Sequence, residues 1–321
     1  MTKPPADDAA GVHAPPRLDR LDAAEVLRRL ELTVTRRLDG LLQGDYRGLV
    51  PGHGSELGEA RPYQPGDDVR RMDWNVTART QVAHVRETIS DRELETWVLA
   101  DLSASLDFGT AACEKRDLAL AAAAAVGFLT ARGGNRSGAV VIDSHGGHVT
   151  VPARSGRAHL LGILHRLATA PRADGGGGTD LGAGIERMAA SIPRRGLAVV
   201  VSDFLSVSPW DTALRHLAMR HDVFGVEVVD PRELELPSVG VLTLVDPETG
   251  AVREVQTGDP KLRDRYARAA ADQRNAIARA LRVAGADHLQ LRTDRDWLRD
   301  VVRFVTHRRA RIETLHQPVH R

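Results

Sequence analysis

The sequence is poor in cysteine, lysine and aromatic residues. Cys113 is its only cysteine, which excludes an internal disulfide and a zinc site built from cysteines. Lysine occurs only at positions 3, 115 and 261, so nearly all of the 44 basic residues are arginine, a bias typical of a GC-rich genome. Because 43 acidic residues leave a net charge of only +1, the chain lacks the basic excess of a protein that binds a nucleic-acid backbone. We therefore expect no nucleic-acid partner.

No long hydrophobic run is present either. Residues 1–20 lack the apolar core of a signal peptide. The longest apolar stretch, Leu118 to Leu129, is rich in alanine and too short to span a bilayer. The sequence predicts a soluble, cytoplasmic protein without membrane insertion.

The composition is otherwise that of a globular protein, with 42% hydrophobic residues available for a core. Residues 1–20 are rich in Pro, Ala and Asp without periodicity, which predicts a disordered tail. Apolar residues at three- and four-residue steps predict an amphipathic helix from Leu21 to Leu42. Residues 45–95 are rich in Gly, Pro, Arg and Asp and contain short strand-like pieces such as Val82–Thr88.

From Thr96 onward, predicted strands and helices alternate. The runs 96–101 and 196–203 are continuously apolar up to a polar end, which is typical of strands buried on both faces. The alternation predicts an α/β fold, with a mainly parallel, Rossmann-like sheet covered by helices on both faces. The other expected elements are strands at 138–143, 148–152, 222–230 and 288–292, a hairpin at 241–257, and helices at 115–131, 157–169, 181–191, 210–220, 261–283 and 296–308.

Polar side chains follow two of the predicted strands. Asp101, Ser103 and Ser105 come at the end of the first strand, Asp203 follows the strand near 197–202, and a glycine-rich loop presents Thr179 just before a helix. Ligands of open α/β sheets bind beyond the carboxyl ends of the strands, so these groups can meet at one edge. They are hard oxygen ligands, which Mg²⁺ or Mn²⁺ favours.

The order Asp-x-Ser-x-Ser, then Thr, then Asp resembles the metal-ion-dependent adhesion site of von Willebrand factor A domains. The resemblance implies that Ser103, Ser105 and Thr179 ligate the metal directly. It also implies that Asp101 and Asp203 act mainly through water, and that an acidic group of a protein partner completes the metal shell.

A second resemblance involves the stretch from Gly52 to Glu87, with RPYQPGDD at Arg61–Asp68 and VRRMDW at Val69–Trp74. This stretch is similar to the signature of the domain of unknown function 58 family, in which it precedes a von Willebrand A-like domain. The likeness spans roughly residues 21–310. It implies a partner that is a MoxR-type AAA+ ATPase or its client, and a chaperone-like role in the assembly or maturation of other proteins.

These features divide the chain into four expected parts. They are a disordered tail (1–20), an N-terminal region with the family signature (21–95), a von Willebrand A-like domain (96–310) and a C-terminal tail (311–321).

Several of these residues also have a simpler structural interpretation. Asp180 is expected to cap the helix after Thr179 rather than bind metal. The four glycines before Thr179 lack the P-loop and dinucleotide-binding patterns, so we interpret them as a flexible turn. The alternating charges of Asp67–Asp73 predict an ion-pair network that clamps the N-terminal region onto the main domain, with partner docking as the alternative. Trp74 suggests that one side of this stretch is buried.

The favoured function is a non-catalytic interaction protein, since no histidine stands among the proposed ligands to act as a base. The alternative is a metal-dependent phosphotransferase or hydrolase that uses the same strand-end site. Against it, Ser103 stands where haloacid dehalogenase-type enzymes carry a second aspartate. A third possibility, nucleic-acid binding through the arginine-rich helix near Arg263–Arg282, conflicts with the nearly neutral charge.

Overall fold

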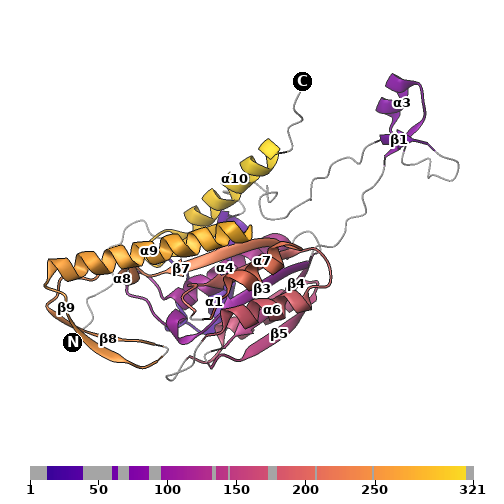
Figure 1. Cartoon of the computed structure of the whole chain (residues 1–321). Helices are drawn as coiled ribbons and strands as arrows, with labels where there is room; N and C mark the ends of the chain where they lie inside the picture. Colours follow the sequence, from indigo (N-terminus) through magenta and orange to yellow (C-terminus); the bar gives the residue numbers. More distant parts are fainter. Residues whose placement is uncertain are drawn as a thin grey trace.

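The computed structural model describes residues 13–38, 60–63, 72–86, 95–131, 135–143, 145–172, 179–206, 208–247 and 249–315. A six-stranded sheet in the order β10-β7-β6-β3-β4-β5 lies at the centre of these residues (Figure 1). Every neighbouring pair is parallel except β4 with β5. The strands are β3 (Glu95–Asp101), β4 (Arg136–Ile142), β5 (His148–Arg154), β6 (Leu197–Ser202), β7 (Asp222–Val229) and β10 (Asp287–Arg292).

Both faces of this sheet are buried under helices. Successive residues of β3 point to opposite sides, so Val98 belongs to one hydrophobic cluster and Leu99 to the other. One face is covered by α1 (Ala23–Leu32), α4 (Lys115–Ala131), α5 (Arg157–Ala168) and α10 (Trp297–Leu315). The other is covered by α6 (Leu181–Ser191), α7 (Asp211–Ala218) and α9 (Pro260–Ala284). The predicted α/β fold with a mainly parallel sheet is confirmed.

The alanine-rich stretch of the sequence forms α4, the helix that packs at the centre of one face. Its alanines are almost completely buried, and Gly127 faces α5 so closely that an added Cβ would lie 2.5 Å from Leu160 Cδ1. Small side chains therefore let α4 approach its neighbours on every side. The helix begins with buried charged residues, Lys115, Arg116 and Asp117, which carry polar groups to the sheet edge.

The N-terminal region packs against α4 and α5. The predicted amphipathic helix is confirmed over α1 and continues as a π-helical stretch, η1 (Thr33–Leu38), while residues 39–42 lie outside the described residues. Residues 13–20 contradict the predicted disordered tail, because Leu18 packs on the core and its N–H donates to Asp117 Oδ1 at 2.9 Å. Residues 1–12 lie outside the described residues.

A small unit precedes the sheet, formed by β1 (Ala60–Pro62), α3 (Trp74–Thr80) and β2 (His84–Arg86), with β1 antiparallel to β2. Asp73 is buried and caps α3, accepting from Asn75 N at 3.1 Å. The next side chain consequently points away, and Trp74 is 68% exposed, so the expectation that it marks a buried side is wrong. The charged residues 67–71 lie outside the described residues, and the predicted ion-pair clamp stays a prediction.

The remaining elements follow the predicted order with modest shifts. The hairpin is confirmed as β8 (Val241–Val245) paired with β9 (Val252–Gln256). Two short helices were not expected, η3 (Ala104–Leu106) and α8 (Pro231–Leu234), and α10 continues to Leu315 rather than ending near residue 308. Among the helices of the described ranges, none has the length and apolar character needed to cross a membrane.

The packing of α1 predicts that the N-terminal helix contributes directly to stability. Leu30 is fully buried in the core, whereas Leu32, two residues later, is 36% exposed. Leu30→Ala should lower the free energy of unfolding by about 2–5 kcal/mol, because it removes buried methyl groups and leaves a cavity. Leu32→Ala, the matched control, should cost less than about 1 kcal/mol. Urea denaturation measures both, and equal effects would contradict the packing of α1.

Candidate functional site

The candidate site lies where β3 and β6 end side by side. Asp101, the last residue of β3, is 1% exposed. Its Oδ1 accepts from Ser103 N at 3.0 Å, and its Oδ2 accepts from Ser202 Oγ, at the end of β6, at 2.7 Å. One carboxylate therefore fixes the loop after β3 and ties it to the neighbouring strand.

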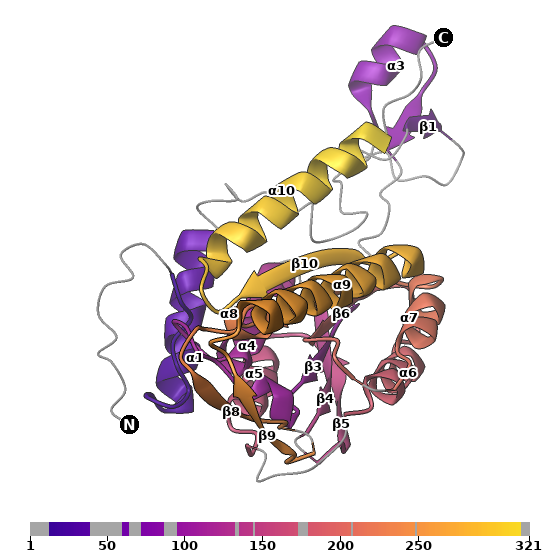
Figure 2. The same ribbon diagram turned by 60° about the vertical axis from the view of Figure 1, so that its left-hand side comes forward.

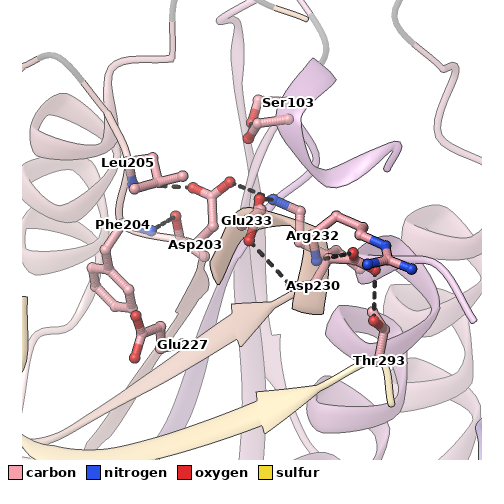
Figure 3. A network of polar contacts seen from close by, with 12 residues as sticks. Ser103, Asp203, Phe204, Leu205, Glu227, Asp230, Arg232, Glu233 and Thr293 are labelled. Carbon is pink, nitrogen blue, oxygen red and sulfur yellow. Dashed lines mark hydrogen bonds and ion pairs between the residues drawn. The ribbon is translucent and has the colours of Figure 1, made fainter. Parts of the chain in front are cut away.

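The loop after β3 presents two serines to Asp203. Ser103 Oγ lies 3.2 Å from Ser105 Oγ, and the Ser105 side chain is a polar neighbour of the Asp203 carboxylate. Asp203 Oδ1 accepts from Leu205 N at 3.1 Å, which orients the carboxylate after β6. Figure 3 shows Ser103 on the same side of the sheet edge as Asp203. The structure thus brings Asp101, Ser103, Ser105 and Asp203 together, as their positions after the strands predict.

Thr179 lies next to the segment that follows β6. It is buried, and its carbonyl oxygen accepts from Ser206 Oγ at 2.6 Å. The glycines before it, residues 175–178, lie outside the described residues. Asp180 caps α6, accepting from Ala183 N at 3.0 Å and from Ser208 Oγ at 2.8 Å, so its predicted capping role is confirmed. The main chain of Thr179 lies beside the segment that follows β6, at the edge where the sequence predicted it. Metal ligation by the Thr179 side chain stays a prediction.

Lys115, at the start of α4, is the main residue of the site that the sequence did not reveal. Its Nζ donates to Asp203 Oδ2 at 2.9 Å and also to Glu233 of α8, and the side chain is 1% exposed. Burial alone would lower the pKa of Lys115, but the two carboxylates outweigh it and raise the pKa above its usual value. The only signal in the sequence was a charged residue at the start of an otherwise apolar helix. Such a residue does not reveal which way its side chain points.

A second row of charges supports this ion pair. Arg274 of α9 donates to Glu227 Oε1 at 3.0 Å, to Glu233 Oε2 at 3.2 Å and to the carbonyl oxygen of Asp203 at 3.1 Å. Glu227, on β7, is fully buried. Burial would raise the pKa of Glu227, but hydrogen bonds from His288 and Gln290 and the charge of Arg274 hold it below its usual range.

Asp230, directly after β7, joins the end of β10 to the loop after η3. It is fully buried and accepts from Thr110 Oγ1 at 2.6 Å and from Thr293 Oγ1 at 2.7 Å. Its own N–H donates to Glu233 Oε2 at 3.1 Å, which closes a capping box on α8 (Figure 3). Polar groups therefore line the carboxyl ends of four adjacent strands, β3, β6, β7 and β10.

Among the residues that the structure describes, this cluster holds more carboxylates than basic groups. The basic groups are Lys115 and Arg274, and the carboxylates are Asp101, Asp203, Glu227, Asp230 and Glu233. Within the described ranges, Asp101 accepts hydrogen bonds from Ser103 and Ser202 and from no basic group, and burial together with the charge of Asp203 raises its pKa above the usual range. For Asp203, burial would raise the pKa, but Lys115 outweighs it and lowers the pKa. A cation near the serine loop would compensate Asp101.

The donor set fits a hard cation only if hydroxyl groups take part. Over the described residues, no three His, Cys, Asp or Glu side chains are grouped as a metal site would require. The oxygens of Asp101 and Asp203 already accept hydrogen bonds from protein donors. Each carboxylate oxygen keeps a second lone pair, which suits it to bind a metal-bound water. Direct contacts would then come from the hydroxyl groups.

The comparisons with known proteins give the family. The model of the family described as Protein of unknown function DUF58 matches residues 59–276. The chain belongs to this family. It is 55% identical over 313 residues to Uncharacterized protein Rv1480 of Mycobacterium tuberculosis and to Uncharacterized protein Mb1516 of Mycobacterium bovis, covering 96% of this chain and 98% of theirs. The predicted family membership is confirmed.

Solved structures show a more distant likeness. The conserved hypothetical protein BatB from Bacteroides thetaiotaomicron aligns with a TM-score of 0.41 and 15% identity. An aerotolerance-related membrane protein from Bacteroides fragilis aligns with a TM-score of 0.43 and 16% identity. Each alignment covers 68% of this chain and 99% of the chain in the solved structure. This likeness is too low to carry an argument about function.

The buried lysine predicts a large and specific loss of stability on substitution. Lys115→Met should lower the free energy of unfolding by about 3–5 kcal/mol, because it removes the buried cation that pairs with Asp203 and leaves Glu233 with Arg274 alone. Arg215→Met is the control, since Arg215 pairs with Asp211 at 3.1 Å on the surface; it should cost at most about 1 kcal/mol. Chemical denaturation in chelator measures both, and a Lys115→Met protein as stable as the control would show that the ion pair contributes little.

Proposed function

We propose that this protein is a non-catalytic interaction module with a von Willebrand factor A-like domain, which binds an acidic group of a protein partner through Mg²⁺ or Mn²⁺. The observation that carries the proposal is the pair of hydroxyl groups of Ser103 and Ser105, 3.2 Å apart, beside the buried carboxylate of Asp101, whose donors among the described residues are Ser103 and Ser202. Ser103, Ser105 and Thr179 would hold the ion, with Asp101 and Asp203 behind water molecules. The ion would supply positive charge to which a partner carboxylate binds.

The lysine supports indirect rather than direct ligation by Asp203. One oxygen of this carboxylate is held by Lys115 and the other by the Leu205 N–H. A cation that took Asp203 as a direct ligand would have to compete with a buried ammonium. The three proposed hydroxyl ligands and water carry no charge, so the ion would keep most of its positive charge for the partner's carboxylate.

We further propose that the partner is a MoxR-type AAA+ ATPase or its client, in the cytoplasm, and that the complex assists the assembly or maturation of other proteins. The support for this is the family resemblance described for the stretch from Gly52 to Glu87, together with membership of the family. The strand-end site supplies the chemistry of an acidic contact but does not select between the ATPase and its client.

The alternative function is a metal-dependent phosphotransferase or hydrolase at the same site. The observation in its favour is the ammonium of Lys115 beside Asp203, a pair that can bind and position a phosphoryl group. Against it, Lys115 is 1% exposed and already donates to two carboxylates. Hydrolysis of p-nitrophenyl phosphate with Mg²⁺ or Mn²⁺ tests this alternative, and turnover that disappears in Asp101→Asn would favour it over the interaction module.

Removal of the hydroxyl groups of Ser103 and Ser105 should strongly weaken metal binding. Ser103→Ala/Ser105→Ala deletes both members of a mutual hydrogen bond and should weaken Mg²⁺ or Mn²⁺ binding by roughly 10–100-fold or more, the loss that even supporting residues of metal sites cause. Isothermal titration calorimetry measures the change. Ser191→Ala, whose hydroxyl bonds Arg187 O on α6, is the control and should bind as the parent does. Unchanged affinity in the double variant would contradict the proposed ligands.

Partner binding should depend on the metal. Proteins that co-purify with the tagged chain in Mg²⁺ should be lost in chelator, and Asp101→Ala should lose them in both conditions because the serine loop is no longer held. Quantitative mass spectrometry of the two eluates measures the difference. A partner that the parent protein retains equally in chelator would count against metal-bridged binding. Circular dichroism checks that Asp101→Ala is folded, so that its loss of partners reports on the site.

A further inference from the structure

β10 forms one edge of the six-stranded sheet, opposite the edge formed by β5. It pairs with β7 in continuous parallel register, from Asp287 with Phe224 to Arg292 with Val229. In the part of the chain that the structure describes, no strand lies on its other side. Such an edge presents backbone N–H and C=O groups to which a further extended chain can add.

The two edges of the sheet differ in their protection. β5 contains Pro152, and its pairing with β4 shifts register between Ser137 and Ala139, a β-bulge or similar irregularity. Proline and bulges are the usual means by which a protein blocks strand addition. β10 has neither, and its central residues His288 to Leu291 carry no permanent charge. The β10 edge is therefore open to pairing in a way that the β5 edge is not.

A groove of about 470 Å³ lies beside this edge. Figure 2 shows the ribbons of β10 and α10 on this side of the sheet. Residues 287–290 of β10 form one side, and α10 forms the other. The helix contributes Arg303, Phe304, His307 and Arg311 to the lining. The groove thus combines a strand edge with a wall that offers an aromatic ring and basic side chains.

The wall carries excess positive charge. The acidic side chain of Asp287 is already paired with Arg308, at 2.6 Å, and with Arg311. Asp300 is the other acid in the lining, and its nearest arginine contact is Arg303 at 3.9 Å. Arg303 and Arg311 are 67% and 62% exposed. Negative charge entering the groove would therefore meet exposed guanidinium groups.

We propose that β10 accepts an acidic, extended segment of a protein partner as an added strand, with its acidic side chains on Arg303 and Arg311 and its backbone on the strand edge. Charge complementarity selects the acidic partner, and the regular, unprotected edge selects an extended one. This surface is separate from the strand-end metal site and does not depend on a bound ion.

A short peptide of alternating glutamate and valine, labelled with fluorescein, tests the proposal by anisotropy with the full-length protein in chelator. The peptide should bind, and the affinity should fall with added salt. Arg303→Glu should weaken binding by about tenfold, because it reverses the charge of the wall. Arg299→Glu is the matched control: Arg299 is 79% exposed on the same helix, has a similar acidic neighbour in Asp296 at 3.6 Å, and is not part of the groove lining.

Strand pairing has a separate readout. A peptide with alternate backbone nitrogens methylated cannot donate along one edge and should lose most of its affinity. Those amides of residues 287–291 that do not donate to β7 should gain hydrogen-exchange protection only with the unmodified peptide. Three results would overturn the proposal: equal loss in Arg299→Glu, equal binding of a lysine–valine peptide, or equal binding of the methylated peptide. Protection of these outward-facing amides in the free protein would overturn it as well, and sedimentation velocity would then tell a second copy from a segment of the same chain.

Discussion

The ion pair between Lys115 and Asp203 is the interaction on which the whole carboxyl edge of the sheet depends. Lys115 reaches this edge from the first residue of α4, and its ammonium group lies between Asp203, after β6, and Glu233, after β7. A carboxylate buried without a partner costs several kcal/mol. Lys115 and, one row further out, Arg274 supply the positive charge that compensates the acids buried at this edge. The same edge carries Asp101, the loop with Ser103 and Ser105, and the segment after β6.

The chemistry of this cation explains why a lysine is found there in a chain whose basic residues are nearly all arginine. An ammonium group is compact and has three donors, so it fits between two carboxylates at the start of a helix. The planar guanidinium group is used one row further out, where Arg274 bridges Glu227, Glu233 and a carbonyl oxygen. A cation at a helix N-terminus is unfavourable for the helix dipole, and the two carboxylates offset this cost.

Much of this arrangement follows from the sequence, and the remainder depends on contacts between distant segments. Strands β3 and β6 are continuously apolar because both of their faces are buried, so their positions and the meeting of Asp101 with Asp203 could be predicted. The direction of the Lys115 side chain could not be predicted, because it depends on how α4 lies across the sheet. Composition likewise predicted disorder at residues 13–20, whereas the hydrogen bond from Leu18 N to Asp117, the contact of His13 with Arg37 and the packing of Leu18 hold that segment. At Trp74, apolar character suggested burial, but the cap formed by Asp73 sets the direction of the side chain.

The strand-end site and the β10 groove are joined by a continuous series of polar contacts. His288, which lines the groove, lies 2.8 Å from Glu227, Glu227 is bound by Arg274, and Arg274 also holds Glu233 beside Lys115. Charge added at either end changes the field at the other, since buried pairs are weakly screened by salt. Such a series of contacts supplies a physical route between the strand-end site and the β10 groove. Coupling between the two sites further requires that the contacts have two alternative arrangements.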